Sequence, residues 1–453
     1  MKLVDLLNRL NIKINERVNL EILNITCDSR KCNKNTLYIN MNNQYLSDAI
    51  NNGIKVIISD KYIDFDGITI YVKDVKSFYY KALKLFYKDL NSYVIGITGT
   101  CGKTTTATLL YETLKYKYNN LLLISSNGNY VFQSRKEEYL DTVNTTPNIE
   151  IIYDLISKYD YDYIIIEVSS QGLMDNRLEG IVFDLAVFLN ISCDHLDYHK
   201  TMNEYFNAKL KLFKQLKKDS IALVNYNLDH KDEIKKIVNN LYTFGIDEGD
   251  YKISYLEPSL EKMSIKLKDK WFITSLSGDF NAENISAVNA IVKILNVSNV
   301  YLELALTNNF KVPGRQNIIN YLDSKIIIDF AHTEKEVERL LIHLRNNCKN
   351  KLYIIIGCGG DRDKSKRPII GKLCEKYGDF CIFTKDNSRS ENTIDIINQM
   401  LTYYNKSNYI VVVNRKDAIK LGISMLKEED ILAVIGMGKE DLKLINEVIT
   451  NEL

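Results

Sequence analysis

The stretch VIGITGTCGKTTTATLLYETLK, residues 94–115, decides the fold of this chain. It begins as a β-branched apolar strand, passes through a turn that carries Gly99 and Gly102, and continues as a helix. The backbone N–H groups of such a turn point into one concavity, and Lys103 adds a positive charge beside it. Thr104 follows directly, where a hydroxyl can join the coordination shell of a phosphate-bound Mg²⁺. The pattern predicts a P-loop, a cradle for nucleotide phosphates.

The spacing departs from the strict G-x-x-x-x-G-K-[ST] pattern at one position. That pattern requires glycine at residue 97, which is Ile97, whereas glycines stand at Gly96, Gly99 and Gly102. An ordinary strand-to-helix turn is the alternative interpretation. The strand, the glycines, the lysine and the helix nevertheless follow in the order that a phosphate cradle requires, which favours the nucleotide site.

Length, charge and cysteine content limit the class of protein. At about 150 residues per domain, 453 residues suggest about three domains. The 59 Lys and Arg residues balance 58 Asp and Glu residues along the chain, so no nucleic-acid footprint is present and small charged ligands are favoured. The eight cysteines form no C-x-x-C pair, the first residues lack the apolar core of a signal peptide, and no apolar run reaches about 18 residues. We expect a reduced, cytoplasmic protein without a membrane span.

Changes of pattern divide the chain into three predicted domains. Residues 1–91 alternate short strands with helical stretches and predict a small α/β domain. Residues 92–311 carry near-continuous apolar runs, which are typical of strands buried on both faces of a parallel sheet. Residues 312–453 alternate strands and helices again and predict a second doubly wound domain, which is Rossmann-like. The predicted fold class is therefore α/β.

Predicted elements can be named by their residues. The runs that predict strands are 36–41, 55–60, 68–72, 161–170, 183–192, 220–227, 325–332, 351–360, 380–388 and 430–438. The runs that predict helices are 75–90, 334–346, 367–378 and 393–404.

Polar residues follow the central strands, where ligands of open α/β sheets gather. Glu167 closes the apolar run IIIEVSSQGL (164–173), where a carboxylate is costly unless it meets a metal, a base or water, so metal ligation and a solvated strand end are the two interpretations. The next stretch, FLNISCDHLDYH (188–199), contains a cluster of polar residues, and a polar loop would explain any one of them. Together its members favour a metal or phosphate environment: Asn190, Asp194, His195, Asp197 and His199. Lys209, in TMNEYFNAKLKLF (201–213), predicts a solvated lysine when considered alone.

An ordered set of motifs, from about residue 92 onward, resembles the Mur ligases. These motifs are GTCGKTTT (99–106), NTTP (144–147), EVSS (167–170), an arginine before FD (Arg177), DHLDYH (194–199), AKLKLF (208–213), FNAEN (280–284), VPGR (312–315), DFAHT (329–333), GCGGDRDKSKRP (357–368) and DNSR (386–389). The resemblance implies a three-domain, ATP-dependent amide ligase that uses Mg²⁺.

The resemblance also implies roles for the residues of the nucleotide site. ATP is bound by Gly99, Thr100, Gly102, Lys103, Thr104, Thr105, Asn281, Arg315, Asp329 and His332. The implied metal-site residues are Thr104, Glu167, His195 and Lys209, and Lys209 acts there as a carbamate. The implied catalytic residues are Lys103, Glu167, His195 and Lys209. Cys101 stands where the resemblance has asparagine, and we expect a tolerated, backbone-donating position there rather than a catalytic thiol.

Within the family, the chain is most similar to ligases that add a diamino acid to UDP-N-acetylmuramoyl-L-Ala-D-Glu through an acyl phosphate in peptidoglycan synthesis. The implied amino-acid site comprises Arg362, Asp386, Asn387, Arg389, Gly436 and Glu440. Arg389 favours meso-diaminopimelate, because an arginine can hold a carboxylate through two parallel hydrogen bonds, although a surface salt bridge is the plain alternative. Ser388, Met437 and Lys439 depart from the family pattern at this site.

The acceptor side departs further from the family. Its implied residues are Ser29, Arg30, Thr145, Thr146, Ser169, Gln171 and Arg177. The G-x-x-x-D-G-H segment after the second strand is missing, so we expect a shortened N-terminal domain, and Gln171 stands where histidine is usual. Three alternatives stay open. The added amino acid is L-lysine, or the chain is a paralogue that acts on another carboxylate, either like folylpolyglutamate synthetase or in a secondary pathway. The third alternative is a non-catalytic P-loop protein. The expected partners are small molecules, without nucleic acid or membrane, and the expected state is a monomer.

Overall fold

The computed structural model describes residues 1–453 except 15–18, 88–90, 143, 268–269, 309 and 453. The chain divides into two compact units, and each is discontinuous in sequence. The first unit comprises Met1–Tyr93, Pro147–Ile164 and Met174–Val182, and the second comprises Val94–Thr146, Ile165–Leu173 and Phe183–Leu453. The first unit therefore contains two segments that lie beyond residue 91.

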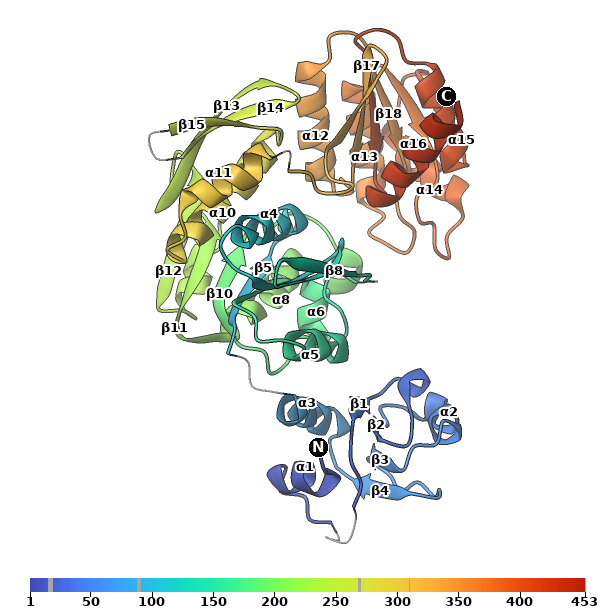
Figure 1. The fold of residues 1–453 in the computed structure, drawn as a ribbon. Helices are drawn as coiled ribbons and strands as arrows, with labels where there is room; N and C mark the ends of the chain where they lie inside the picture. The colour runs from blue at the N-terminus through green and yellow to red at the C-terminus, as the bar shows by residue number, and fades with distance from the viewer. Residues whose placement is uncertain (15–18, 88–90, 143, 268–269, 309, 453) are drawn as a thin grey trace. The chain divides into compact units, whose positions relative to one another are not determined.

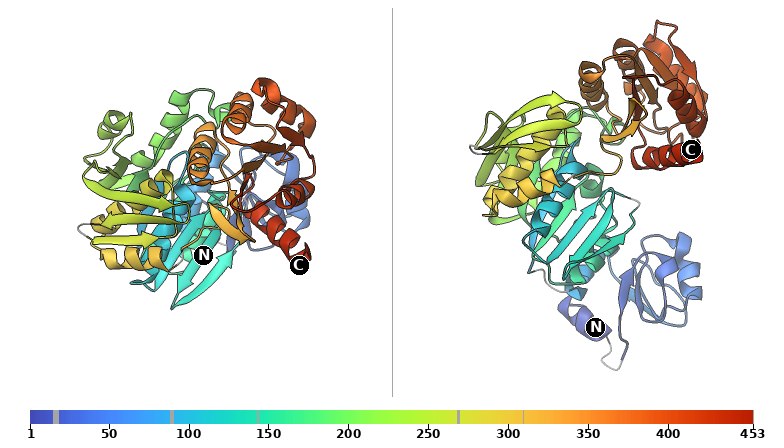
Figure 2. Two further views of the ribbon diagram at one scale, coloured as in Figure 1. Left: turned by 90° about the horizontal axis from the view of Figure 1, so that it is seen from above. Right: turned by 45° about the horizontal axis from the view of Figure 1, so that its top comes forward.

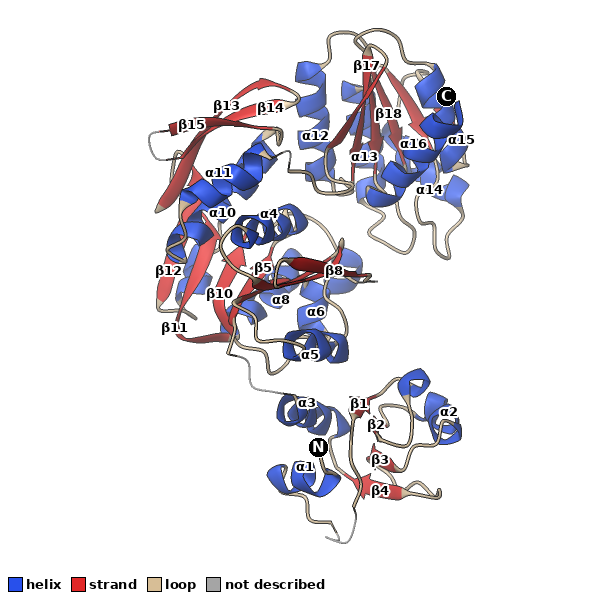
Figure 3. Ribbon diagram, in the orientation of Figure 1, coloured by secondary structure: helices blue, strands red, loops and turns tan. Residues whose placement is uncertain are grey.

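A parallel sheet of strand order β1-β2-β3-β4 forms the centre of the first unit (Figure 3). Its strands are β1 (Asn24–Thr26), β2 (Thr36–Ile39), β3 (Val56–Ser59) and β4 (Ile68–Tyr71), and the unit's helices are α1 (Leu3–Arg9), α2 (Leu46–Asn51), α3 (Val75–Phe86) and α5 (Ile149–Ser157). The strands predicted at 36–41, 55–60 and 68–72 are confirmed. The helix predicted at 75–90 is confirmed over α3, and residues 88–90 lie outside the described residues.

A buried carboxylate joins α5 to the rest of the first unit. Glu150 is 7% exposed, and its carboxylate accepts hydrogen bonds from the Thr26 hydroxyl at 2.8 Å, the Cys27 amide at 3.0 Å and the Tyr79 hydroxyl at 2.5 Å. A buried carboxylate without such donors would be costly, so these three donors stabilise it. The cluster packs α5 against the end of β1 and against α3.

The central part of the second unit is built on a mixed sheet of strand order β15-β14-β13-β12-β11-β10-β5-β9-β6-β7-β8. Strand β10 pairs in parallel with β5 and β11, whereas β6–β8 and β13–β15 pair antiparallel at the two ends. The strands are β5 (Tyr93–Thr98), β6 (Asn120–Ser125), β7 (Gly128–Gln133), β8 (Lys136–Leu140), β9 (Tyr163–Glu167), β10 (Phe183–Phe188), β11 (Leu216–Asn225), β12 (Asn240–Ile246), β13 (Tyr251–Ser259), β14 (Lys262–Leu267) and β15 (Lys270–Thr274). The helices are α4 (Lys103–Lys115), α6 (Ser170–Met174), α7 (Leu196–His199), α8 (Met202–Lys214), α9 (Lys231–Lys235), α10 (Asp279–Ile294) and α11 (Asn299–Thr307). The three apolar runs predicted as central strands are confirmed as β9, β10 and β11.

The C-terminal part of the second unit carries helices on both faces of a sheet of strand order β16-β17-β21-β18-β19-β20 (Figures 1 and 2). Its strands are β16 (Asn317–Tyr321), β17 (Ser324–Asp329), β18 (Leu352–Ile356), β19 (Phe380–Phe383), β20 (Tyr409–Val411) and β21 (Ile431–Ile435). Its helices are α12 (Glu334–Asn347), α13 (Lys366–Tyr377), α14 (Thr393–Met400), α15 (Arg415–Ser424) and α16 (Lys439–Glu452). Only β16 pairs antiparallel to its neighbour among the paired strands described here.

Alternation along the C-terminal strands explains the two helical layers. Ile354 and Ile356 of β18 pack with α12, α13 and α14, whereas Tyr353 and Ile355 pack with α15 and α16. Successive side chains of a strand point to opposite faces, so a strand that is apolar at every position must be covered on both. The doubly wound arrangement predicted for residues 312–453 is confirmed.

Candidate active site

The turn between β5 and α4 has the geometry of a phosphate cradle. Gly102 adopts φ +81°, and a Cβ atom there would lie 2.2 Å from Oδ1 of Asn284, so only glycine fits. The Lys103 ammonium donates to the carbonyls of Gly99 at 2.9 Å and Thr100 at 2.7 Å and so lies over the turn. The predicted strand, turn and helix are confirmed. Ile97 lies within β5, so the glycine-rich turn begins only after the strand has ended.

Cys101 contributes its backbone to the turn. The register of β5 with β10 places Thr98 opposite Phe188, which brings the two following loops together. The Cys101 amide donates to Oδ1 of Asn190 at 2.9 Å, and the Asn190 amide donates to the Cys101 carbonyl at 3.2 Å. Burial raises the pKa of the Cys101 thiol well above its usual range, which disfavours thiolate chemistry.

Glu167 lies at the end of β9 beside the first turn of α4. Its carboxylate is fully buried and accepts hydrogen bonds from the Ser126 hydroxyl at 2.9 Å and the Thr104 hydroxyl at 3.3 Å. Burial raises the pKa of Glu167, and the nearby Lys103 ammonium opposes that shift. Of the two interpretations, a solvated strand end is therefore wrong, because the carboxylate is buried.

Lys209 is buried, contrary to the expectation from its local sequence. The side chain is 1% exposed, and its Nζ donates to the Gly99 carbonyl at 2.8 Å and lies 4.4 Å from the centre of the Tyr205 ring. In the described part of the chain no carboxylate forms an ion pair with it. Burial holds the pKa of Lys209 well below its usual range, and Lys103 adds to that effect. Burial therefore favours the neutral form of this amine relative to that of an exposed lysine.

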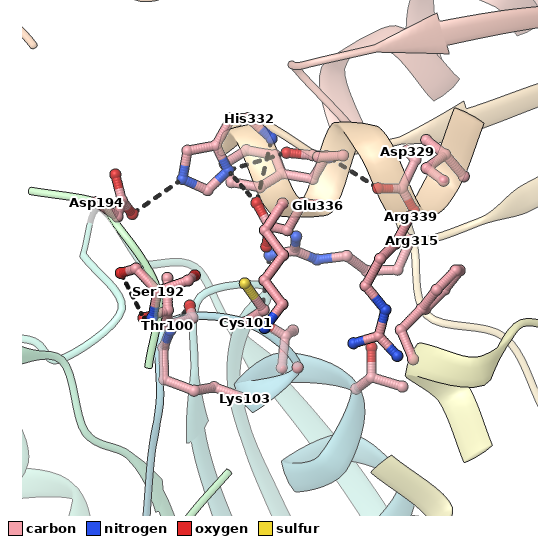
Figure 4. Close-up of a pocket in the computed structure, with 18 of the residues that line it drawn as sticks. Thr100, Cys101, Lys103, Ser192, Asp194, Arg315, Asp329, His332, Glu336 and Arg339 are labelled. Carbon is pink, nitrogen blue, oxygen red and sulfur yellow. Dashed lines mark hydrogen bonds and ion pairs between the residues drawn. The ribbon is translucent and has the colours of Figure 1, made fainter. Parts of the chain in front are cut away.

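A row of charged side chains borders the cavity beside the P-loop (Figure 4). His332 lies 3.5 Å from Oδ2 of Asp194 and 3.3 Å from Oε2 of Glu336, whereas His195 lies 3.2 Å from the same Asp194 oxygen. Burial alone would lower the pKa of His332, but the charges of Glu336 and Asp194 raise it. Burial lowers the pKa of His195 to about 3, so this imidazole is neutral and able to act as a ligand.

The carboxyl ends of four neighbouring strands bring the C-terminal motifs together. In register, Ile435 of β21 lies beside both Asp329 of β17 and Ile356 of β18, and Ile356 lies beside Phe383 of β19. The loops that follow these strands therefore meet at one edge of the sheet. The meeting loops are those of DFAHT, GCGGDRD, KDNSR and GMGKED.

One cavity of about 580 Å³ connects this edge with the P-loop. Most residues predicted from the sequence line it: Thr100, Gly102, Lys103, Thr104, Thr105, Thr145, His195, Asn281, Arg315, Asp329, His332, Arg362, Asp386, Asn387, Arg389, Gly436 and Glu440. Two predicted residues outside the lining are bonded to each other, since the Ser169 hydroxyl donates to Oγ1 of Thr146 at 3.0 Å. Gln171 is half-buried in α6. Ser29, Arg30 and Arg177 belong to the first unit.

In the first unit, the predicted acceptor residues carry the following contacts. Arg30 is exposed, and its guanidinium donates to both oxygens of Asp28 at 2.8 Å. Ser29 is buried, and its carbonyl accepts from the Asn52 amide at 2.9 Å. Arg177 forms an ion pair with Asp175 at 2.8 Å.

Comparison with known proteins identifies the family. Residues 97–292 match the Mur ligase middle domain, and residues 314–438 match the Mur ligase glutamate ligase domain. The UDP-N-acetylmuramoyl-L-alanyl-D-glutamate–2,6-diaminopimelate ligase of Caldanaerobacter subterraneus subsp. tengcongensis is 32% identical over 99% of this chain and 96% of its own length. The chain belongs to the Mur ligase family. The ligase of the same name from Clostridioides difficile is 34% identical, over 99% of this chain and 96% of its own.

Solved structures agree with the fold. A UDP-N-acetylmuramoyl-L-alanyl-D-glutamate–2,6-diaminopimelate ligase aligns with a TM-score of 0.64 at 24% identity, covering 100% of this chain and 99% of its own. MurF ligase from Thermotoga maritima, solved in complex with ADP, aligns with a TM-score of 0.71 at 17% identity, covering 95% and 97%. The Mur ligase fold expected from the sequence is confirmed. Mur ligases are ATP-using enzymes, so the prediction of a ligase is confirmed as well.

Several residues that line the cavity were not predicted from the sequence. Glu336 is recognisable from the sequence only as part of a helix-capping box with Thr333, which the structure confirms. Ser126 lies in none of the quoted motifs, and Lys366 lies in GCGGDRDKSKRP (357–368) but was not assigned a role. Lys366 lies 3.7 Å from Asp194 across the cavity.

None of the helices in the described residues has the length and apolar character needed to cross a membrane.

Proposed function

We propose that this Mur ligase adds meso-diaminopimelate to UDP-N-acetylmuramoyl-L-Ala-D-Glu, with ATP as the energy source. The observation that carries the proposal is the single cavity, which is lined by Lys103 of the P-loop at one side and by Arg389 and Glu440 at the other. Phosphoryl transfer to a carboxylate oxygen and amide formation at the carboxyl carbon involve the same carboxyl group, so their binding groups must share one space. The names of the relatives support the same reaction.

The reaction proceeds through an acyl phosphate. A carboxylate oxygen of the acceptor attacks the γ-phosphorus of ATP and ADP leaves; the neutral amine of the amino acid then attacks the acyl carbon and phosphate leaves. Phosphoryl transfer requires little covalent chemistry from the protein, so positioning and charge stabilisation dominate. Lys103 supplies positive charge at the turn, and Asn281, Arg315, Asp329 and His332 bind the nucleotide from the other side of the cavity.

The residues around Glu167 fit Mg²⁺. This buried carboxylate and the Thr104 hydroxyl offer oxygen ligands, and Thr104 lines the same cavity as the neutral His195. Mg²⁺ in proteins keeps several waters and is held through one or two carboxylates plus substrate phosphates. In the described residues no group of three or more His, Cys, Asp or Glu side chains forms a metal cage, which agrees with that mode of binding. When bound, Mg²⁺ neutralises charge on the transferring phosphoryl group.

Lys209 completes the metal site as a carbamate in this proposal. A neutral amine adds to CO₂ and releases a proton, which leaves a carboxylate on Nζ. The buried amine of Lys209, with its low pKa and a single carbonyl acceptor, is suited to that addition. The carbamate would supply an additional anionic oxygen ligand beside the Gly99 carbonyl of the turn.

The amino-acid site combines charges of both signs. Arg389 and Arg362 offer guanidinium groups to carboxylates, and Glu440 offers a carboxylate to an ammonium group. A diamino diacid presents two of each, which matches this set better than a monocarboxylic amino acid does. For the acceptor, we propose contacts with Ser29, Arg30 and Arg177, and with Thr145, Thr146, Ser169 and Gln171. The substrates are soluble nucleotides and an amino acid, so we propose a cytoplasmic location.

The proposed function is tested by phosphate release from the purified protein. UDP-N-acetylmuramoyl-L-Ala-D-Glu, ATP and Mg²⁺ are supplied with meso-diaminopimelate, L-lysine or other amino acids, and the product is weighed by mass spectrometry. We expect phosphate release and a product mass that contains diaminopimelate. Preference for L-lysine, or turnover only with another carboxylate acceptor, would replace the proposal with the corresponding alternative.

Arg389→Ala should reduce the use of meso-diaminopimelate selectively. Losing a charge-assisted contact to the distal carboxylate costs on the order of 2–3 kcal/mol, or about 30- to 150-fold in kcat/KM. L-Lysine lacks that carboxylate and serves as the internal control. Arg389→Lys keeps the charge but loses the paired geometry and should fall between the parent and the alanine variant. Equal losses with both amino acids would show that Arg389 does not contact the distal carboxylate.

A further inference from the structure

Two loops that border the amino-acid site are held together at very short range. The first, residues 357–365, follows β18, and the second, residues 386–392, follows β19. The Gly360 amide donates to the Asn387 carbonyl at 2.9 Å, and a Cβ atom on Gly360 would lie 1.9 Å from the Ser388 carbonyl oxygen. Only a glycine allows this approach, so the first loop is in a position to fix the conformation of the second.

Asp361 contacts Arg389 and the residue that follows it in the second loop. Its carboxylate accepts hydrogen bonds from the Ser390 hydroxyl at 2.7 Å and the Ser390 amide at 3.2 Å. Its carbonyl oxygen accepts from Nη1 of Arg389 at 3.3 Å. One residue therefore holds both the backbone that follows Arg389 and the guanidinium itself. Arg389 also lines the cavity, so its guanidinium has further donors that can serve a ligand there.

Asp361 and Arg389 both have a left-handed backbone conformation, which residues other than glycine rarely adopt. Asp361 has φ +50° and Arg389 has φ +48°. Such conformations cost on the order of 1–3 kcal/mol and persist only where surrounding contacts impose them. Here the contacts between the two loops impose them, and the Arg389 side chain is directed by that imposed conformation.

A buried ion pair anchors Asp361 in turn. The Arg367 side chain is fully buried and donates to both carboxylate oxygens of Glu391 at 2.9 and 2.8 Å, and to the Gly359 carbonyl at 3.0 Å. Glu391 accepts the Asp361 amide at 2.6 Å. Because both terminal nitrogens of the Arg367 guanidinium are hydrogen-bonded, Arg367 and Glu391 keep one orientation. Glu391 therefore fixes Asp361 relative to the core of the C-terminal part.

The residue before Arg389 explains why this clamp is needed. Ser388 does not fix φ as a proline would, so the turn depends on other contacts. In the structure Ser388 is 7% exposed, and its hydroxyl lies 2.6 Å from the Thr393 hydroxyl. The hydrogen bond between these two hydroxyls therefore stabilises the turn, which has no proline ring to fix it.

We propose that Asp361 is a positioning residue that aims Arg389 at the distal carboxylate of the incoming diamino acid. This inference rests on the proposed function, because it assumes that Arg389 contacts that carboxylate. Asp361 does not touch the substrate in this proposal. It sets specificity by fixing the direction of the guanidinium.

The test compares Asp361→Asn and Asp361→Gly with the parent. Glycine and asparagine both tolerate the positive φ, so neither change adds backbone strain. We expect kcat/KM for meso-diaminopimelate to fall about 10-fold, mainly through KM, while kcat/KM for L-lysine and KM for ATP stay within about two-fold. In an Arg389→Ala background, the same Asp361 changes should have no further effect, because the group they aim is gone.

The chain supplies a matched control in the same loop. Asp363 accepts from the Ser365 amide at 2.9 Å and the Ser365 hydroxyl at 2.6 Å, as Asp361 does from Ser390, but its bonds stay within its own loop. Asp363→Asn should leave selectivity between the two amino acids unchanged. Ser390→Ala removes one of the two bonds to Asp361 and should show a smaller loss of the same kind.

The outcomes separate this inference from the proposed function. If the parent does not use meso-diaminopimelate, both are wrong. If the parent uses it and Arg389→Ala loses it, but both Asp361 variants keep the parent selectivity, only the positioning role is wrong. Equal losses for both amino acids in the Asp361 variants, or the same loss in Asp363→Asn, would indicate a general structural effect and would also overturn the inference.

Discussion

Lys103→Ala should lower ATP turnover at least about 10³-fold while leaving the protein folded. The ammonium lies over the turn that we propose binds the phosphates, where it would place positive charge beside the transferring phosphoryl group. Electrostatic groups of this kind are worth several kcal/mol in the transition state, and each 1.36 kcal/mol is tenfold in rate. Turnover is measured as phosphate release with both substrates present.

Lys117→Ala is the matched control for this change. Lys117 is exposed just after the same helix, α4, and lies over the ring of Tyr118 rather than over the turn. It should retain parent turnover. The thermal midpoint of Lys103→Ala should stay within a few degrees of the parent, since the side chain adds charge and two backbone contacts and no apolar core. Turnover within a few-fold of the parent would show that the turn does not act as a P-loop.

Lys209→Ala should lose about 10³-fold in activity and recover part of it with added short-chain carboxylic acids. The alanine leaves a cavity where the carbamate is proposed to stand, and a small carboxylate can enter that space and supply the missing oxygen ligands. Lys209→Met should lose activity without leaving the cavity and should not be rescued. Carbon-13 NMR of protein equilibrated with labelled CO₂ should show a carbamate signal in the parent alone.

Lys214→Ala is the control for Lys209, because it removes an exposed lysine from the same helix. It should keep parent activity and the carbamate signal. Full activity of Lys209→Ala without any additive would remove the carbamate from the mechanism. If Lys209→Ala loses activity but the parent shows no labelled carbamate signal, Lys209 acts through its unmodified side chain.

Local patterns were sufficient to predict the fold. The P-loop is one contiguous stretch, and the C-terminal strands are apolar at every position, which requires helices on both faces. The order of the motifs also predicted which loops meet, since the carboxyl ends of parallel strands share one edge. Gly102 illustrates the limit, because its positive φ is a local property, whereas its contact with Asn284 depends on α10, which lies far along the chain.

The environment of single side chains could not be predicted in the same way. Lys209 belongs to a helix whose other lysines are exposed or half-buried, and only the packing of α8 beside the Gly99 carbonyl makes it buried. Glu336 caps its own helix, and its second role beside His332 requires the fold to be complete. The setting of Ser388 is similar, because its hydroxyl lies 2.6 Å from that of Thr393, which begins the next helix, α14.

The contacts of Glu150 bear on how parts of Mur ligases can be exchanged. A chimaera joined at residue 91 would take Thr26, Cys27 and Tyr79 from one parent and α5 from the other. Three donors would then face a side chain that evolved beside different partners. The same holds for a fragment that ends at residue 91, which would leave those donors without an acceptor. Transplanting the first unit intact therefore requires all three of its segments to be moved together, so recombination between relatives should preserve the pairing of residues 1–93 with 147–164 and 174–182.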